Sequence, residues 1–439
     1  MNFKCVAMLV GLAVVLSWLQ LGSAHAQPDE YERPPIEYSK TTPANCISKL
    51  QAAIDSGKTQ LPYDDNFGYL PALLDALKVS RTSQSLVFSK TSFQRDKIAP
   101  RTPRALYFND DVYIGFCQRG EVLEISAVDP QLGAVFYTIE QSATRPPKFF
   151  RQGDNCLLCH GSSRNDGVPG HLIRSVFPDG AGMPILSSGS YRTDHRSPFD
   201  QRWGGWYVTG THGTQSHLGN LIIRQRQVPQ PLDNSAGQNV VDLQKFFDRS
   251  AYLTGHSDIV ALLVLEHQTF AHNLLARASY LTRQALHYEQ TLNRELNKPD
   301  GYQWESTERR IKNAGDPLIE CLLFAEEMPI TEKIRGTTEF AAEFSQQGVR
   351  DKLGRSLRDF DLETRLFKYP CSYLIYSPAF DALPTEVRTY VYRRLWEVLT
   401  AKESNKPNKK FDHLSHADRT AILEILRDTK PNLPAYWNE

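Results

Sequence analysis

A short segment, Cys156-x-x-Cys159-His160, constrains this chain more than any other feature of its sequence. Two thiols at this spacing lie about one helical turn apart, so they can form thioether bonds with the two vinyl groups of a haem. The imidazole that follows then lies beneath the iron as an axial ligand. Gly161 comes next and lets the backbone turn away from the porphyrin. The spacing therefore predicts one covalently attached haem c.

The main competing interpretation is a zinc site made of cysteine and histidine. Such a site needs four ligands, which are usually supplied in closely spaced pairs. The sequence has no second C-x-x-C pair and no H-x-x-x-H pair. The residues thus favour haem over zinc.

The N-terminus indicates export. Lys4 precedes an apolar run from Val6 to Leu21, and Ala24-His25-Ala26 has the form of a signal-peptidase site. We expect a signal peptide over residues 1–26 and a mature chain that begins at Gln27. An uncleaved anchor is the alternative, but the apolar run is short for a membrane span. The expected location is the periplasm or the cell exterior, without a transmembrane anchor.

The charge of the chain is balanced, with 50 basic and 50 acidic residues. A balanced surface supplies no global field that would attract nucleic acid or an anionic membrane. The expected partner is a redox protein or a small-molecule electron donor or acceptor, and no nucleic acid.

The cysteines are compatible with an oxidising compartment. Of the seven, Cys5 belongs to the signal peptide and two belong to the haem motif. The other four could form two disulfides in any of three pairings, or could be buried free thiols, and the sequence does not decide between these: Cys46, Cys117, Cys321 and Cys371.

The periodicity of hydrophobic residues divides the mature chain into three regions. Residues 27–144 predict helices near 45–58 and 70–80 and then an antiparallel meander over 85–141, because short β-branched and aromatic runs alternate with turn residues. Residues 145–239 show little periodicity and include twelve of the 26 glycines between 153 and 219. A haem can organise such irregular backbone, so we assign this region to it.

Residues 240–439 have a helical pattern. A long helix is expected from a cap at Ser257 or Thr254 to about Leu296. Further helices are expected at 316–327, 336–345, 384–402 and 415–428, the last with a capping box from Ser415 to Asp418. The predicted class is α+β: a small antiparallel β region, an irregular haem-binding segment and a mainly helical C-terminal half.

The occupant of the sixth iron position decides between electron transfer and catalysis. Met183 lies in a Gly-Met-Pro loop typical of His/Met cytochromes, and Met328 also precedes a proline. His212 and His217 lie in a segment rich in glycine and aromatic residues that could line a porphyrin. An open or water-bound position is the remaining alternative.

Other polar residues could act beside the haem. His171 and His195 lie close to the motif in sequence, and Glu266 with His267 could handle protons. Arginines often pair with haem propionates, and three follow the motif: Arg192, Arg196 and Arg202. The alternatives are solvated surface charge for the arginines and polar groups at a helix interface for Glu266 and His267.

The motif, with Gly161 after it, resembles the haem-binding segment of the c-type cytochrome superfamily. The resemblance implies covalent haem through Cys156 and Cys159, with His160 as axial ligand, and it covers a small part of the chain. The whole resembles large bacterial exported proteins with one cytochrome c-like haem segment. A small class I cytochrome has a helix before the motif, whereas here Pro146 and Pro147 and a β-rich region precede it.

Three functions follow from these expectations. The first is electron transfer by an exported monohaem c-type cytochrome. The second is a haem-dependent, peroxidase-like oxidoreductase with an open or exchangeable sixth position, which the length of the chain favours. The third is a haem-based sensor or interaction protein.

Overall fold

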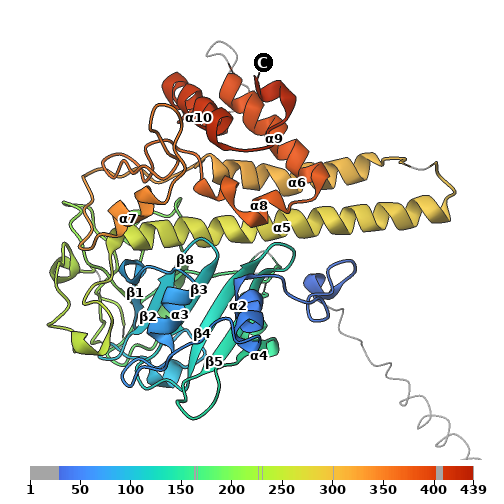
Figure 1. Cartoon of the computed structure of the whole chain (residues 1–439). Helices are drawn as coiled ribbons and strands as arrows, with labels where there is room; N and C mark the ends of the chain where they lie inside the picture. Colours follow the sequence, from blue (N-terminus) through green and yellow to red (C-terminus); the bar gives the residue numbers. More distant parts are fainter. Residues whose placement is uncertain are drawn as a thin grey trace, which may run out of the picture.

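The structure is a computed structural model and describes residues 29–162, 165, 167–225, 227–229, 231–299, 301–401 and 409–438 (Figure 1). The predicted signal peptide and Cys5 lie outside these residues. The fold is α+β, as the sequence predicts: an antiparallel sheet forms one part and helices form the C-terminal half.

Seven strands form the main sheet, in the order β6-β5-β4-β3-β2-β1-β9, and every neighbouring pair is antiparallel. The predicted meander over 85–141 is confirmed. Two strands from the predicted haem segment extend it, one at each edge. The strands are β1 (Ser85–Val87), β2 (Arg104–Phe108), β3 (Val112–Phe116), β4 (Val122–Asp129), β5 (Gly133–Glu140), β6 (Phe149–Gln152) and β9 (Trp206–Tyr207).

The alternation of side chains along the strands gives the sheet two different faces. Val112, Ile114 and Phe116 of β3 point to the face that packs on two short helices, α2 (Cys46–Asp55) and α3 (Leu70–Ala76). Tyr113 and its cross-strand partner Ser126 point to the opposite face. The first face is apolar, whereas the second carries the polar groups that contact the haem segment.

The two predicted N-terminal helices are confirmed. Both end three to four residues earlier in the structure than the sequence predicts. The Asn45 side chain accepts hydrogen bonds from the backbone N–H groups of Ile47 and Ser48, and so starts α2 at the predicted position.

One long helix, α5 (Ile259–Glu295), lies across the end of the sheet that holds the β2–β3 and β4–β5 turns (Figure 1). Its 37 residues give it a length of about 56 Å. It is apolar enough to span a membrane by length and composition, but 94% of its most apolar window is buried inside the fold. We therefore interpret α5 as the core helix of the molecule.

The start of α5 differs from the prediction by one cap. Asp258, rather than Ser257 or Thr254, accepts the hydrogen bond from Val260 N–H. The Ser257 hydroxyl instead donates to Tyr207 O and accepts from Leu86 N–H, which joins β9 to β1. Ser257, which the local sequence pattern favoured as the N-cap, therefore makes hydrogen bonds to other elements instead.

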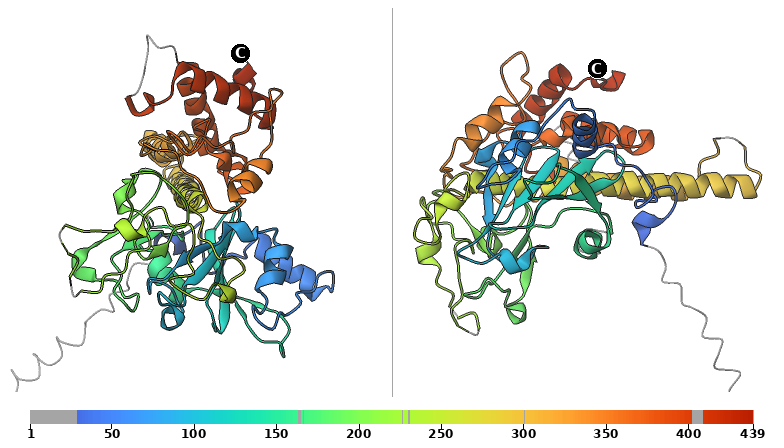
Figure 2. Two further views of the ribbon diagram at one scale, coloured as in Figure 1. Left: turned by 90° about the vertical axis from the view of Figure 1, so that its left-hand side faces the viewer. Right: turned by 60° about the horizontal axis from the view of Figure 1, so that its bottom comes forward.

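Most of the C-terminal helices stack on the side of α5 that faces away from the sheet, as Figure 1 and the left view of Figure 2 show. The helix predicted over 316–327 instead covers Glu305–Leu322 and contains Pro317 in its interior. The predicted capping box is confirmed, with Asp418 in place of Glu. The helices are α6 (Glu305–Leu322), α7 (Phe340–Gln346), α8 (Pro378–Asp381), α9 (Thr385–Thr400) and α10 (His416–Thr429).

Between β6 and α5 the chain is mostly irregular, as expected. It contains α4 (Asp154–His160) and a two-stranded ribbon of β7 (Arg174–Val176) and β8 (Ser190–Arg192). This segment crosses the polar face of the sheet and returns to it as β9, which pairs with β1.

Candidate haem-attachment site

The haem motif lies on α4, a short helix that directly follows the edge strand β6. Cys156, Cys159 and His160 are spaced i, i+3 and i+4, so they share one face of the helix. Cys159 is exposed, Cys156 and His160 are half-buried, and Leu158 is 78% exposed. Leu157 is buried in the core between the sheet and α2, which fixes the helix to the fold. Both thiols are free.

The orientation of His160 is set by one hydrogen bond. Its Nδ1 lies 2.9 Å from the carbonyl oxygen of Gly170. A carbonyl only accepts, so Nδ1 carries the proton and donates. The other ring nitrogen, Nε2, then carries a lone pair. A metal-binding histidine almost always makes such a bond through its second nitrogen, so this geometry fits an axial haem ligand.

The Gly170 carbonyl is itself held in place by α5. The Asn273 side chain accepts from His171 N–H at 2.7 Å and donates to His171 O at 2.7 Å. A Cβ atom added to Gly170 would lie 2.3 Å from Asn273 Oδ1, so glycine is required there. Asn165 also donates to His160 O at 2.7 Å. The position of His160 therefore depends on a chain of contacts that begins on α5.

The pKa values of the motif suit ligand chemistry. Burial lowers the pKa of His160 below its usual value, and the Gly170 carbonyl offsets this only in part, so the ring is neutral at pH 7. Burial, with the Glu124 carboxylate, raises the pKa of Cys156 to about 11. A neutral imidazole is the form of histidine that binds a metal ion.

Gly161 caps α4 for a different reason from the one that the sequence indicates. Its φ is −109°, which any residue can adopt. A Cβ atom at this position would lie 3.0 Å from the Tyr31 ring and 3.1 Å from Leu157 O. The glycine therefore permits the N-terminal segment to approach α4 closely.

Met183, one of the candidates for the sixth iron ligand, lies near the other side of the sheet. Gly182 O accepts from Lys90 N–H, just beyond β1, whereas the His160 ring packs on Phe136 of β5 at 4.8 Å. Four strand spacings separate β5 from β1, or about 19 Å. The Met183 side chain is 49% exposed. The fold thus does not bring Met183 to His160.

His212 and His217 lie together, but also away from His160. Their rings are 4.7 Å apart, and they are buried against Phe199. Their segment contacts the start of α5, where Thr209 forms a bridge with Asp258. That point lies about 22 Å along the helix from Asn273. His212 Nε2 and His217 Nδ1 already accept backbone N–H groups.

A layer of buried imidazoles lies beside His160 on the polar face of the sheet. His171 Nε2 lies 2.8 Å from the Ser126 hydroxyl, and the His171 ring is 4.2 Å from the Tyr113 ring. His272 of α5 faces the same tyrosine, with Nδ1 2.9 Å from its hydroxyl. Burial lowers the pKa of His272 to about 3 and that of His171 well below its usual value. These groups pack behind the Phe136 ring that supports His160.

The possible acid–base pair on α5 is engaged elsewhere. Glu266 is fully buried and its carboxylate lies 3.0 Å from the Arg202 guanidinium. Burial raises the pKa of Glu266 to about 7 in spite of this cation. Arg196 pairs with Asp194 at 2.8 Å, and the Arg192 guanidinium lies 6.0 Å from the Phe270 ring centre. All belong to the region around the first third of α5.

The four other described cysteines are free thiols, so the disulfide alternative is not realised in this structure. Burial raises the pKa of Cys46 to about 11 and of Cys117 and Cys371 to about 12, and raises that of Cys321 further.

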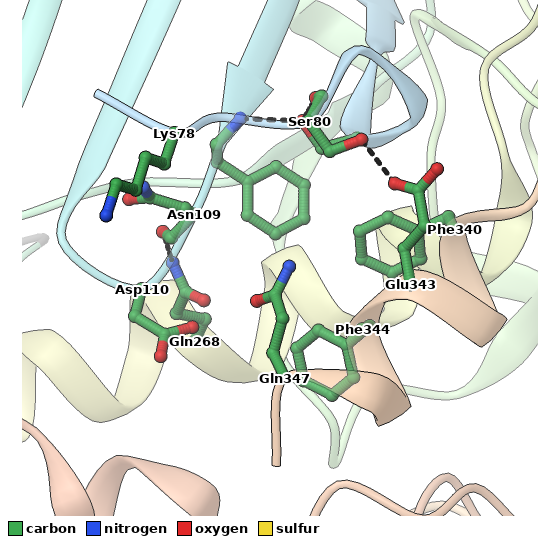
Figure 3. A pocket seen from close by; sticks show the side chains of 11 residues that line it. Lys78, Ser80, Asn109, Asp110, Gln268, Phe340, Glu343, Phe344 and Gln347 are labelled. Carbon is green, nitrogen blue, oxygen red and sulfur yellow. Dashed lines mark hydrogen bonds between the residues drawn. The ribbon is translucent and has the colours of Figure 1, made fainter. Parts of the chain in front are cut away.

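A small pocket elsewhere on the molecule has no role at this site. Figure 3 shows it between the turn before β3, the start of α5 and α7. Its polar walls are already paired: Ser80 donates to Glu343 at 2.5 Å, and Gln268 donates to Asn109 O at 2.8 Å. The pocket therefore offers few free polar groups to a ligand.

The low pKa of His272 predicts acid sensitivity of the fold. The folded pKa is about 3, below the unfolded value of about 6.5, so this group's contribution to stability is complete above about pH 6.5 and is lost as the pH falls toward 3. In His272→Gln, the free energy of unfolding should fall less steeply on acidification, by about 1.4 kcal/mol per pH unit between pH 4 and 6. Urea denaturation at several pH values measures this slope.

The matched control is Tyr113→Phe. It removes the hydroxyl that faces His272 but keeps the titrating imidazole, so stability should fall equally at every pH. A His272→Gln slope identical to that of the original protein would contradict the account.

No pattern in the sequence identifies the residues that hold His160 in place. Asn273 is 102 positions from the His171 backbone that it binds, and no periodicity links the two.

Comparison with protein-family models, with curated proteins and with solved structures finds no match to this chain. Its function must therefore be argued from its own residues and their geometry.

Proposed function

We propose that this chain is an exported monohaem c-type cytochrome that transfers electrons through a haem bound to Cys156, Cys159 and His160. The observation that carries the proposal is the hydrogen bond from His160 Nδ1 to Gly170 O at 2.9 Å. It leaves Nε2 with a lone pair on the same helix face as both thiols. Bound there, the haem would supply one-electron chemistry.

The surface around α4 supports electron transfer. Cys159 is exposed and Leu158 is 78% exposed, so a group attached through these positions would lie at the surface. Phe150 of the neighbouring strand β6 is also 43% exposed. Exposed apolar side chains of this kind suit brief contact with a redox partner protein, for which small, weakly held interfaces are typical.

A second function, a haem-dependent oxidoreductase, is favoured by one observation. Met183 lies beside β1, four strand spacings from β5, and the segment of His212 and His217 contacts α5 about 22 Å along the helix from Asn273. None of these three described side chains can close the sixth position in this arrangement. An open or exchangeable position would permit a small substrate to reach the iron.

Addition of cyanide distinguishes the two functions. The absorption spectrum of the purified ferric protein should shift if the sixth position is open, and should be unchanged over minutes if a side chain closes it. An unchanged spectrum with reversible reduction supports electron transfer. A shift, together with turnover of peroxide, would replace electron transfer with the oxidoreductase.

Attachment through the two thiols is tested by Cys156→Ser combined with Cys159→Ser. We expect complete loss of haem staining on a denaturing gel, because no thioether can form. The protein should be exported from a host that matures haem c. Cys46→Ser, which removes another half-buried thiol, should stain like the original protein. Staining of the double variant would refute the assignment.

The role of Asn273 in positioning His160 is tested by Asn273→Ala. Covalent haem should be retained, since both thiols remain. The bond between His160 and iron should weaken about 10- to 100-fold, as loss of an outer hydrogen bond typically causes. The measurement is the concentration of added imidazole that displaces His160, followed by absorption.

Asn293→Ala is the matched control for this variant. Asn293 also makes two hydrogen bonds from α5, to Tyr302 O and Trp304 Nε1, but at the far end of the helix. It should need the same imidazole concentration as the original protein. Equal behaviour of the two variants would contradict the positioning role.

A further inference from the structure

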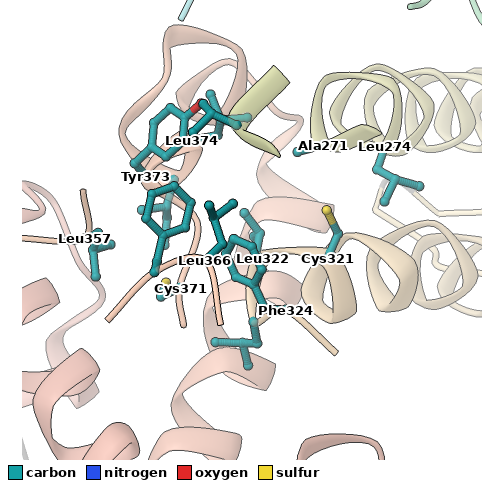
Figure 4. Close-up of a cluster of buried hydrophobic side chains, with 14 of the residues drawn as sticks. Ala271, Leu274, Cys321, Leu322, Phe324, Leu357, Leu366, Cys371, Tyr373 and Leu374 are labelled. Atoms are coloured by element: carbon teal, nitrogen blue, oxygen red, sulfur yellow. The ribbon is translucent and has the colours of Figure 1, made fainter. Parts of the chain in front are cut away.

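A second group of potential metal ligands lies on the other side of α5, between α5 and α6. It consists of His195, His267 and Cys321, which are 2%, 0% and 2% exposed. One ligand atom of each lies within 4.8 Å of the others. His195 follows β8, His267 is on α5 and Cys321 is on α6. Figure 4 shows Cys321 projecting from α6 toward Ala271 and Leu274 of α5.

The two imidazoles face each other through the same type of nitrogen. His267 Nδ1 lies 3.2 Å from His195 Nδ1. Two nitrogens bound to one metal ion at about 2.0–2.1 Å are about 3.3–3.6 Å apart, for angles between tetrahedral and trigonal. The pair therefore needs almost no movement to hold an ion. The thiol completes a third position from the opposite helix.

Contacts outside the cluster hold these side chains in place. His267 Nε2 lies 2.8 Å from the Ser372 hydroxyl, which leaves Nδ1 free to bind a metal when Nε2 donates. The Phe324 ring stacks on His267 at 4.2 Å and also contacts His195 at 5.1 Å. Met328 N–H and an Arg202 N–H both donate to His195 O at 3.0 Å. These contacts hold the His267 ring and the His195 main chain in place.

The donor set and the surrounding charge favour copper(I). Two imidazoles and a thiolate are soft and borderline ligands, which select copper or zinc rather than magnesium or calcium. None of the nearest carboxylates is an unpaired anion, because Glu266 pairs with Arg202 and Asp194 pairs with Arg196. A divalent ion would leave a net positive charge in this buried space, whereas Cu⁺ with one thiolate is neutral.

We propose that His195, His267 and Cys321 bind one copper(I) ion. Binding forms one Cu–S bond and two Cu–N bonds and releases the thiol proton to solvent, with no change in oxidation state. The site does not depend on the haem motif, because the two lie on different faces of α5. Its presence can therefore be tested whether or not haem is attached.

The test is the copper content of protein purified from cells grown with added copper. Metal must enter during folding, because all three ligands are buried. In haem-loaded protein the Cys156 and Cys159 thiols are consumed, and in a Cys156→Ser/Cys159→Ser background they are absent, so neither form can bind copper there. We expect about one copper ion per chain in both forms, falling at least about tenfold in Cys321→Ala and in His195→Gln.

Cys371→Ala is the matched control, since it removes an equally buried thiol from the same core and should retain copper. X-ray absorption at the copper edge of the unmodified protein gives a second measurement that needs no variant. One sulfur and two nitrogen neighbours support the site. Absence of copper, copper that persists in Cys321→Ala, or zinc in its place would overturn the proposal.

Discussion

The burial of α5 is the constraint on which the rest of the structure depends. Burying an unpaired polar group costs free energy, so a helix of 37 residues with most of its surface inside the fold needs partners for the polar side chains that it carries. Gln268 donates to Asn109 O and to Tyr113, and Asn273 binds both main-chain groups of His171. These bonds fasten the sheet and the irregular segment to the helix. The two candidate sites are consequences of this requirement.

At the candidate haem site, hydrogen bonds from the buried helix α5 determine the orientation of His160. Asn273 fixes the backbone at His171, the adjacent Gly170 carbonyl fixes the His160 ring, and the ring leaves Nε2 as its only acceptor. On another face of the same helix, His267 meets His195 and Cys321. The irregular segment is held by hydrogen bonds from α5 and by its own polar side chains, whereas the sequence suggested only that a haem could organise it.

Local patterns predicted much of the fold. Asn45 and the pair Ser415–Asp418 act within one helical turn, so the sequence placed the helices that they begin. The strands of the meander are neighbours along the chain, so their pairing was also predictable. The predicted start of α6 was wrong. A proline favours the first turn of a helix, so Pro317 suggested a start near residue 316. The helix instead begins at Glu305 and packs against α5.

Features that depend on distant residues could not be predicted. β9 joins β1 only after the chain has crossed the sheet, and His195, His267 and Cys321 are separated by 72 and 54 positions. Spacing rules for metal sites consider short intervals, so they favoured haem over zinc at Cys156–His160 but gave no prediction for this cluster. The same limit applies to the candidates for the sixth iron ligand. Met183 follows His160 by only 23 positions, yet the fold places it near the other side of the sheet.

Identification of the residues that carry the haem is the most direct test of the account. Trypsin should release residues 152–164 as one peptide, because Arg151 and Arg164 flank the motif. Mass spectrometry of the digest from exported protein should find the haem mass on this peptide, attached through both Cys156 and Cys159. Haem on another peptide, or an unmodified 152–164 peptide from haem-containing protein, would contradict the central claim.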